Sequence, residues 1–300
     1  MKSLRFFLCF IAISVLAVSA AQGQTWVSGT GNDNNPCTRT QPCKTFAGAY
    51  AKTAAGGEID ALDPGNYGAI NITHSITIDG GDNQMAVIQN GINDAAINVS
   101  AAAGETVTLR NLKLRSSSSA ALGIVVNGGG YALHIEHCAL SGFSIAGIFV
   151  NSSTQASGTQ FYLDGTVVRD GAIGLSVGGN VSATISNSRF LGNTSFGVIV
   201  DGSGSNVAIS DSEASGNIVG FDVNNASAPS SSLYLSNSIA ANNQSGVYAW
   251  GAESAIILSN VFLFNNSVAG ISTGSGAVVN SFKNNSNAGS GVPSGTMALQ

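Results

Sequence analysis

The sequence predicts an all-β solenoid, in which one chain winds through successive parallel coils. The main observation is a repeated phrase in the second half of the chain: an apolar-alternating strand, an Asn or Asp, and a further strand that begins at Gly. Its copies align on Asn187, Asp211, Asn237 and Asn260, at steps of 24, 26 and 23 residues. A repeat of this length with Asn and Gly at its bends is typical of one solenoid coil.

The alternation within each copy predicts strands with one buried face. Alternate residues of a strand face opposite sides, so equivalent apolar residues of successive coils are expected to stack inside. These residues are Ile185, Ile209, Leu235 and Leu258. Eight to ten coils at a strand spacing of ~4.8 Å give a rod of roughly 40 to 50 Å with a single core.

The bends of the repeat are marked by residues that tolerate tight backbone conformations. Asn and Asp also hydrogen-bond nearby backbone, so the four aligned residues are expected to form a structural ladder along the rod. That ladder comprises Asn187, Asp211, Asn237 and Asn260. The other corners are assigned to glycines, because glycine adopts strained turns without steric cost. These are Gly197, Gly220, Gly246 and Gly270.

The amino terminus has the pattern of an export signal. Lys2 and Arg5 precede an apolar stretch over residues 6–18, and small residues follow, so cleavage is expected after Ala20 or Gly23. We therefore assign residues 1–23 to a signal peptide and expect a periplasmic, cell-surface or extracellular protein. A membrane anchor is the alternative, but the stretch is short for a span of ~20 residues. No stable transmembrane span is expected after cleavage.

Residues 24–56 are expected to cap the solenoid. Cys37 and Cys43 bracket a short loop, and in an oxidising compartment they are expected to form a disulfide. Residues 45–55 have helical spacing and end at a Gly pair. A helix this short needs a surface to pack on, and the open end of a solenoid offers one. Residues 57–288 then form the coils, and residues 289–300 form a cap or tail.

Charge is unusually sparse. Charged residues make up 9% of the chain, and the net charge is −5. Loss of Lys2 and Arg5 with the signal leaves 11 − 2 = 9 basic against 16 acidic residues, a net charge of −7. No basic stripe is present to neutralise phosphates, so nucleic acid is not an expected partner.

The chain resembles the secreted bacterial right-handed parallel β-helix repeat proteins of the pectate-lyase-like superfamily. The resemblance lies in the repeated phrase, in the opening at 57–67 with 75–80, and in an entry at 35–46 that is similar to members without an assigned activity. It implies a right-handed parallel β-helix over nearly all of residues 25–285. It does not imply one activity, because this fold carries lyases, hydrolases, esterases, epimerases, adhesins and phage spikes.

The catalytic patterns of such enzymes are not found in the sequence. A pectate-lyase-like calcium site needs several converging carboxylates, and here the densest set is Asp211, Glu213 and Asp222. The Gly-His-Gly and Arg-x-Lys strings that a resemblance to polygalacturonases would require do not occur. We therefore expect no cofactor, with calcium left as an open alternative, and we assign neither a catalytic nor a metal site.

One constellation remains as a candidate site. His137 and Asp164 occupy equivalent positions in adjacent coils, and Glu136 precedes His137. Together they suit metal binding or acid–base chemistry. The alternative is that His137 and Asp164 only replace ladder asparagines and pair with each other.

A second candidate surface is aromatic, because such side chains can stack on sugar rings. Its members are Tyr131, Phe143, Tyr162, Tyr248 and Trp250, with core packing as the alternative for each. The function that the sequence favours is a binding or structural role at the cell surface or in the periplasm, with polysaccharide or cell-surface glycan as partner. The alternative is a carbohydrate-active enzyme, a lyase or hydrolase on acidic polysaccharide.

Overall fold

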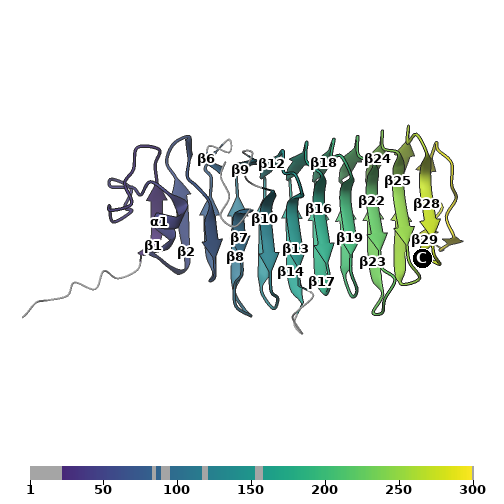
Figure 1. Ribbon diagram of the computed structural model, residues 1–300, viewed down its shortest axis with the longest axis horizontal. Coiled ribbons are helices and arrows are strands. Elements are labelled where there is room, and N and C mark those ends of the chain that lie inside the picture. The colour runs from purple at the N-terminus through teal and green to yellow at the C-terminus, as the bar shows by residue number, and fades with distance from the viewer. Residues whose placement is uncertain (1–21, 83–85, 89–94, 117–120, 153–157, 299–300) are drawn as a thin grey trace, which may run out of the picture.

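The computed structural model describes residues 22–82, 86–88, 95–116, 121–152 and 158–298, so most of the expected signal peptide lies outside the described residues. These residues form a parallel β-solenoid of about eight turns with one short helix, which confirms the predicted fold class. Figure 1 shows the strands side by side along a rod, with the helix and a loop region at its amino-terminal end.

The described residues form three parallel sheets that run along the rod. The twelve-stranded sheet contains β1 (Gln22–Val27), β2 (Thr53–Ala61), β5 (Ile76–Asp79), β8 (Thr106–Arg110), β11 (Ala132–Glu136), β14 (Thr159–Asp164), β17 (Val181–Ser186), β20 (Asn206–Ser210), β23 (Ser231–Ser236), β26 (Ser254–Ser259), β29 (Val278–Ser281) and β31 (Gly295–Thr296). The ten-stranded sheet contains β3 (Gly65–Asn66), β6 (Ala86–Ile88), β9 (Leu112–Arg115), β12 (Ala139–Ser141), β15 (Val167–Arg169), β18 (Arg189–Leu191), β21 (Glu213–Ser215), β24 (Ile239–Ala241), β27 (Phe262–Phe264) and β30 (Ser286–Asn287). The nine-stranded sheet contains β4 (Ile70–Ile72), β7 (Ala95–Val99), β10 (Leu122–Asn127), β13 (Ala146–Asn151), β16 (Ile173–Gly178), β19 (Phe196–Asp201), β22 (Val219–Asn224), β25 (Ser245–Trp250) and β28 (Ala269–Gly274).

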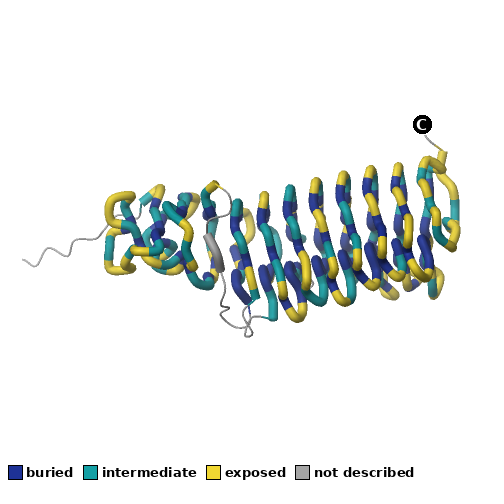
Figure 2. The backbone as a smooth tube through the Cα atoms, turned by 90° about the horizontal axis from the view of Figure 1, so that it is seen from above, coloured by how far each residue is buried: buried dark blue, intermediate teal, exposed yellow. Residues whose placement is uncertain are grey.

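The expected aliphatic stack is present in the core. Ile185 pairs with Ile209, Ile209 with Leu235, and Leu235 with Leu258, and each of the four is at most 1% exposed. Figure 2 shows buried segments on every coil alternating with exposed bends. Each turn therefore buries its apolar side chains on those of its neighbours, and the hydrophobic effect acts along the whole rod.

The corner after the twelve-stranded sheet has the predicted conformation. Asn187, Asp211, Asn237 and Asn260 have φ angles of 50°, 51°, 47° and 54°, in the left-handed region that Asn and Asp tolerate. At the carboxyl-terminal end Asn260 donates from Nδ2 to Oδ1 of Asn237 at 2.9 Å. Asn187 instead donates to Asp164 at 2.8 Å. Backbone bonds between coils also run through this corner, as from Asp211 N–H to the carbonyl of Ser236.

The strongest asparagine ladder is a different one, and it faces inward. Asn193, Asn217, Asn243 and Asn266 are at most 8% exposed. The Oδ1 atom of each later residue accepts two bonds from the preceding residue, one from its backbone N–H and one from its side-chain Nδ2, at 2.9 to 3.2 Å. These side chains satisfy backbone groups that the bend removes from the sheets, which would otherwise be buried without partners.

A second inward stack contains hydroxyl groups. Thr166, Ser188, Ser212 and Ser238 are at most 4% exposed. The N–H of each of the first three donates to the hydroxyl of the next residue in the stack, at 3.1 to 3.2 Å. The hydroxyl of Ser188 donates in turn to the carbonyl of Ser186 at 2.7 Å. The bend next to the left-handed corner is thus satisfied from inside the coil.

The assignment of Gly197, Gly220, Gly246 and Gly270 to corners is wrong. They lie within β19, β22, β25 and β28, and they are not among the described residues with positive φ. A Cβ atom on Gly197 would lie 2.6 Å from the carbonyl oxygen of Gly220, so glycine is needed there for close approach between coils. The left-handed residues at this bend include Gly192, Gly216, Asn242 and Asn265.

The amino-terminal cap contains the predicted disulfide, Cys37–Cys43, but its helix is shorter than predicted. Helix α1 spans Phe46–Tyr50 rather than residues 45–55, with Thr45 as its N-cap. Residues from Thr53 onward instead form β2, which pairs with β1 at the start of the segment expected to cap the solenoid. Sheet pairing overrides the helical propensity of this alanine-rich segment, because β1 offers an edge that β2 must cover. Strand β2 also crosses the boundary expected between residues 56 and 57.

The two ends of the solenoid are covered by chain. Phe46 and Ala49 of α1 are fully buried, and the rings of Phe46 and Tyr67 lie 5.2 Å apart. In the expected carboxyl-terminal cap, β31 adds to β29 and extends the twelve-stranded sheet. Both ends therefore limit the exposed sheet edge that a second chain could pair with.

Replacement of Asn217 by alanine is expected to lower the free energy of unfolding by roughly 3 kcal/mol, because it leaves the N–H of Asn193 and the carbonyl of Phe190 buried without their partner. Urea unfolding followed by circular dichroism measures this. The matched control is Asn71→Ala on the exposed face of β4, expected to change stability by less than about 0.5 kcal/mol. Equal effects of the two substitutions would contradict a stabilising role for the inner ladder.

Candidate functional site

His137 and Asp164 lie near each other, but they do not occupy the equivalent positions that the sequence predicted, because Gly165 takes the left-handed position after Asp164. Strands β11 and β14 are adjacent, with Glu136 opposite Asp164, and His137 follows at the bend with φ of 51°. Its Nε2 atom lies 3.9 Å from Oδ2 of Asp164, and the two side chains are 66% and 41% exposed. An exposed ion pair at this distance contributes little to stability.

Asp164 has stronger partners on the following coil. Its Oδ1 atom accepts from the hydroxyl of Ser186 at 2.6 Å and from Nδ2 of Asn187 at 2.8 Å. These two hydrogen bonds, with His137 as a smaller contribution, hold the pKa of Asp164 below its ordinary value. The carboxylate is therefore ionised and engaged in the corner, which suits a structural role better than proton donation.

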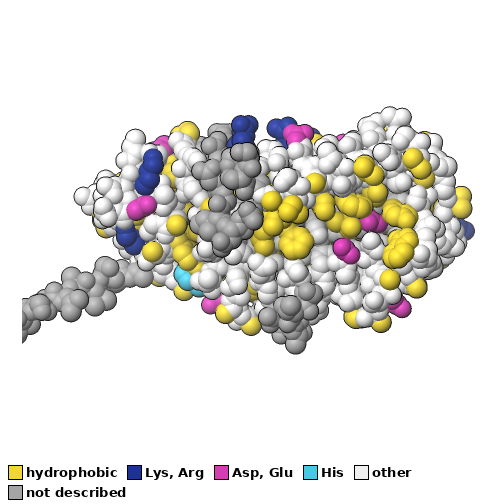
Figure 3. Space-filling view, in the orientation of Figure 1, with side chains coloured by type: hydrophobic (Ala, Val, Ile, Leu, Met, Phe, Trp, Pro, Cys, Tyr) yellow, Lys and Arg dark blue, Asp and Glu magenta, His cyan; other side chains and the backbone are white. Residues whose placement is uncertain are grey.

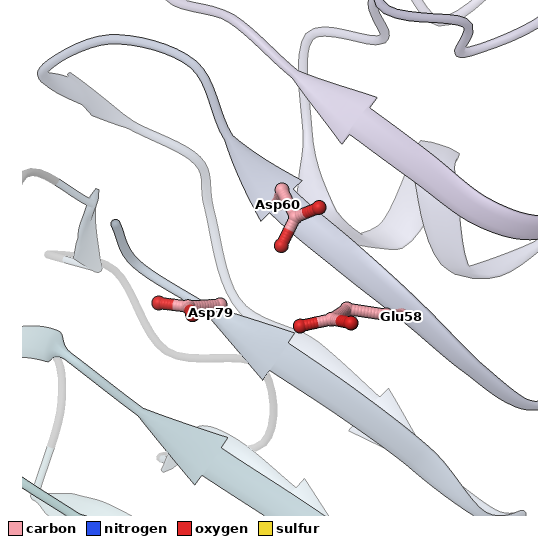
Figure 4. A group of neighbouring side chains, drawn as sticks. All are labelled: Glu58, Asp60 and Asp79. Atoms are coloured by element: carbon pink, nitrogen blue, oxygen red, sulfur yellow. The ribbon is translucent and has the colours of Figure 1, made fainter. Parts of the chain in front are cut away.

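A group of carboxylates not singled out from the sequence lies in the first coils (Figure 4). One oxygen atom from each of Glu58, Asp60 and Asp79 lies within 4.8 Å of the others, and Figure 4 shows the three side chains between β2 and β5. Arg110 donates to Glu58 at 2.5 Å and to Asp79 at 2.7 Å. These oxygens suit a divalent cation, but Arg110 already supplies positive charge to two of them.

The pKa shifts in this group fit an ion-pair network. Burial, followed by the charge of Asp60, raises the pKa of Glu58. Burial alone would also raise the pKa of Asp79, but bonds from Asn111, Gly81 and Arg110 outweigh it and lower that pKa. Asp60 accepts from Gln24 at 2.6 Å. The sequence leaves the calcium alternative open without assigning it a site, and it stays a prediction. On these contacts the cluster of Glu58, Asp60 and Asp79 is a structural network across three coils.

The outer face of the nine-stranded sheet carries a buried acid. Strand alternation directs Asp222 outward between Ile199 and Tyr248, yet it is only 1% exposed. Its Oδ1 atom has no hydrogen-bond partner among the described residues. Burial first, and then the charge of Asp201, raise its pKa from 3.8 to about 7. Figure 3 shows acidic side chains within a band of hydrophobic side chains on this face.

The outer face of the twelve-stranded sheet carries a shallow groove of about 410 Å³. Tyr162 and Tyr234, 37% and 39% exposed, stand at its two ends, in register with Thr184 and Ala208 between them. A parallel row of polar side chains lines one side: Gln160, Ser182, Asn206 and Ser232. Two aromatic rings flanking small side chains make a recess that a flat ring can enter.

The predicted aromatic surface is therefore divided among different places. Tyr131 and Phe143 are core residues, 2% and 1% exposed. Tyr248 and Trp250 lie on the outer face of the nine-stranded sheet, where Trp250 is 39% exposed. Only Tyr162 lines the groove, and His134 stacks on it with ring centroids 4.5 Å apart. Tyr234 was not among the candidates, although its place between Leu233 and Leu235 indicates an outward side chain.

Comparison with known proteins identifies the family of this fold. Residues 122–288 match the family model described as a right-handed beta helix region, which is more than half of the chain. The chain belongs to the right-handed β-helix family. None of the curated proteins compared with this β-helix matches it.

Solved structures share the fold at low identity. XylC in complex with xylose has a TM-score of 0.64 at 9% identity, over 85% of this chain and 68% of that chain. The alginate lyase from Paenibacillus sp. str. FPU-7 has a TM-score of 0.53 at 13% identity, over 85% and 99%. The pectate lyase Pel9A has a TM-score of 0.50 at 18% identity, over 92% and 76%. At these identities the likeness shows the fold alone. Among the described residues, no helix is long and apolar enough to cross a membrane.

Substitution of His137 by asparagine is expected to change the free energy of unfolding by less than about 0.5 kcal/mol, because asparagine suits the left-handed bend. His137→Val is expected to cost about 1–2 kcal/mol, because a β-branched residue is strained at positive φ. Chemical unfolding of both variants measures the difference. A loss above about 1.5 kcal/mol for His137→Asn would show that the imidazole itself, rather than the bend, matters.

The contribution of Asp222 to stability is expected to fall as pH rises from about 4 to 7, because folded Asp222 keeps a proton that the unfolded chain releases. The raised pKa of Asp222 contributes its full stabilisation at pH values below the ordinary pKa of an aspartic acid. This contribution is lost as pH rises through about 7. Asp222→Asn should therefore stabilise the protein at pH 8, by up to about 4 kcal/mol, and change little at pH 4. Thermal unfolding at both pH values tests this, and an equal effect at the two would contradict it.

Proposed function

We propose that this β-helix is an exported polysaccharide-binding protein with a surface or periplasmic role, and that it binds along the twelve-stranded sheet. The observation that carries the proposal is the groove between Tyr162 and Tyr234. Half-exposed tyrosine rings offer apolar faces and hydroxyl groups with little loss of conformational freedom, which suits sugar rings. The row of amide and hydroxyl side chains beside them offers hydrogen bonds to sugar hydroxyls.

Two further observations support this proposal. The disulfide Cys37–Cys43 suits an oxidising compartment outside the cytoplasm. Among the structures that share the fold, one is described as a complex with xylose, and others as a pectate lyase and an alginate lyase. Long parallel solenoids present extended surfaces of repeated side chains, and such surfaces suit extended ligands.

The alternative function, a carbohydrate-active enzyme, has two supporting observations: the raised pKa of Asp222, and the pectate lyase and alginate lyase among the structures that share the fold. A general acid must come within hydrogen-bond distance of the bond that it protonates. Asp222 is 1% exposed, and its Oδ1 atom lies beneath the surface, so a sugar docked on this face does not reach it. Binding without turnover is therefore the better-supported proposal.

Affinity gel electrophoresis against xylan, a soluble glucan, polygalacturonate and alginate tests the proposal. At least one polysaccharide is expected to retard the protein, and Tyr162→Ala and Tyr234→Ala are each expected to weaken binding about tenfold, a loss of ~1.4 kcal/mol. The matched control is Trp250→Ala, an equally exposed aromatic on the nine-stranded sheet.

No retardation by any of the four polysaccharides would count against the proposed function. Loss of binding in Trp250→Ala alone would move the site to the other sheet. Release of reducing or unsaturated ends during the same incubations would favour the enzyme alternative.

A further inference from the structure

The groove runs along the rod axis rather than along a strand. Tyr162, Thr184, Ala208 and Tyr234 are successive register partners on β14, β17, β20 and β23. The two tyrosines are therefore separated by three strand spacings, ~14 Å. The floor between them is low, because a threonine and an alanine occupy the positions where aromatic side chains would fill the recess. An occupant must be narrow and must extend across the strands.

Polar rows border the floor on both sides. One polar row lies two residues before the register row of Tyr162, Thr184, Ala208 and Tyr234. On the same four strands it contains Gln160, Ser182, Asn206 and Ser232. Within this row the Ser232 hydroxyl donates to Oδ1 of Asn206 at 2.9 Å, which orients the amide. The other polar row lies two residues after Thr184, Ala208 and Tyr234 on β17, β20 and β23. It contains Ser186, Ser210 and Ser236. Hydroxyl and amide groups on both edges match a ligand whose two edges carry hydroxyl groups.

The electrostatics select against an anionic ligand. None of the described residues that line the groove is Asp, Glu, Lys, Arg or His. The nearest charge in the bordering rows is the carboxylate of Asp164, two residues after Tyr162, and its lowered pKa keeps it ionised. The whole chain also carries a net charge of −5. A polyuronate would enter this groove without a cation to pair with and against a net negative field.

We infer that the groove takes an uncharged, extended polysaccharide, whose chain lies parallel to the solenoid axis with one segment of its rings between Tyr162 and Tyr234. This inference rests on the proposed function and names its ligand class and direction. His134, stacked on Tyr162, continues the aromatic row by one strand towards the amino terminus. The sugar rings lie over Thr184 and Ala208, and the amide and hydroxyl rows bind the hydroxyl groups along their edges.

Isothermal titration calorimetry of the full chain with xylohexaose, cellohexaose, hexagalacturonate and hexaguluronate tests the ligand class. At least one neutral hexasaccharide is expected to bind ten times more tightly than either uronate. The corresponding neutral disaccharide is expected to bind at least ten times more weakly than the hexasaccharide, because it cannot reach both tyrosines. Equal or tighter binding of a uronate, or equal binding of the disaccharide, overturns the inference.

Substitutions that block the groove floor test where the bound polysaccharide lies. Ala208→Tyr places a ring in the middle of the groove at an exposed strand position, and it is expected to weaken hexasaccharide binding at least tenfold. Ala208→Ser is the matched control and should stay within twofold. Thr184→Tyr serves as an independent second block, and circular dichroism establishes that each variant is folded. Unchanged affinity in the folded tyrosine variants overturns the inference.

The outcomes separate the inference from the function on which it rests. If no hexasaccharide binds and no polysaccharide retards the protein, the proposed function fails. If a polysaccharide retards the protein but no hexasaccharide binds, the inference alone fails. If a hexasaccharide binds and Tyr162→Ala weakens it, but uronates are preferred or the floor variants have no effect, the function stands and the inference alone fails.

Discussion

The structure depends on how the chain satisfies its backbone hydrogen bonds where it turns from one sheet to the next. Strands of adjacent coils pair with each other, but a bend removes N–H and C=O groups from that ladder and buries some of them. The inner asparagine ladder satisfies such groups, because the side chains of Asn217, Asn243 and Asn266 each accept the backbone N–H of the asparagine one coil earlier. Without such bonds, tight bends around an apolar core would carry several unpaired groups per turn.

This constraint also determines the surface. Because every coil turns at the same place, outward residues about two dozen positions apart in sequence become neighbours at one strand spacing. Tyr162 and Tyr234 are brought to one groove in this way, and so are Glu58 and Asp79 to Arg110 in the first coils. No local segment of the chain contains either arrangement. Both are produced by coil register, and a slip of one residue in one strand would turn its side chains to the opposite face.

The sequence contains enough information for the architecture and for part of the detail. The repeat gave the register of Ile185 with Ile209 and the left-handed bend at Asn187, because both follow from strict periodicity. The helix was predicted too long, since local propensity does not reveal that residues from Thr53 onward cover the edge of β1. Gly197 was misplaced at a corner, because glycine needed for close approach and glycine needed for a bend look alike in a sequence.

The candidate sites were harder to predict. His137 and Asp164 were expected at equivalent positions, but the register places Glu136 opposite Asp164. The bonds from Ser186 and Asn187 to Asp164 depend on side-chain geometry that the sequence does not reveal. The burial of Asp222 depends on its place between Ile199 and Tyr248, which alternation alone would have left exposed. Tyr234 could have been found from alternation, because it lies between two core leucines. That Tyr234 forms one end of a groove depends on the small side chains between it and Tyr162, which are brought into line only by coil register.

A solenoid with equivalent bends can change length only in whole turns. Insertion or loss of one repeat keeps the inner asparagine ladder and the aliphatic stack continuous, because each turn contacts only its neighbours. The spacing between Tyr162 and Tyr234 would then change in discrete increments of ~4.8 Å rather than continuously. Under the proposed function, duplication or loss of a turn between the two rings would change the length of ligand that the groove accepts, while each turn keeps the same packing against its neighbours.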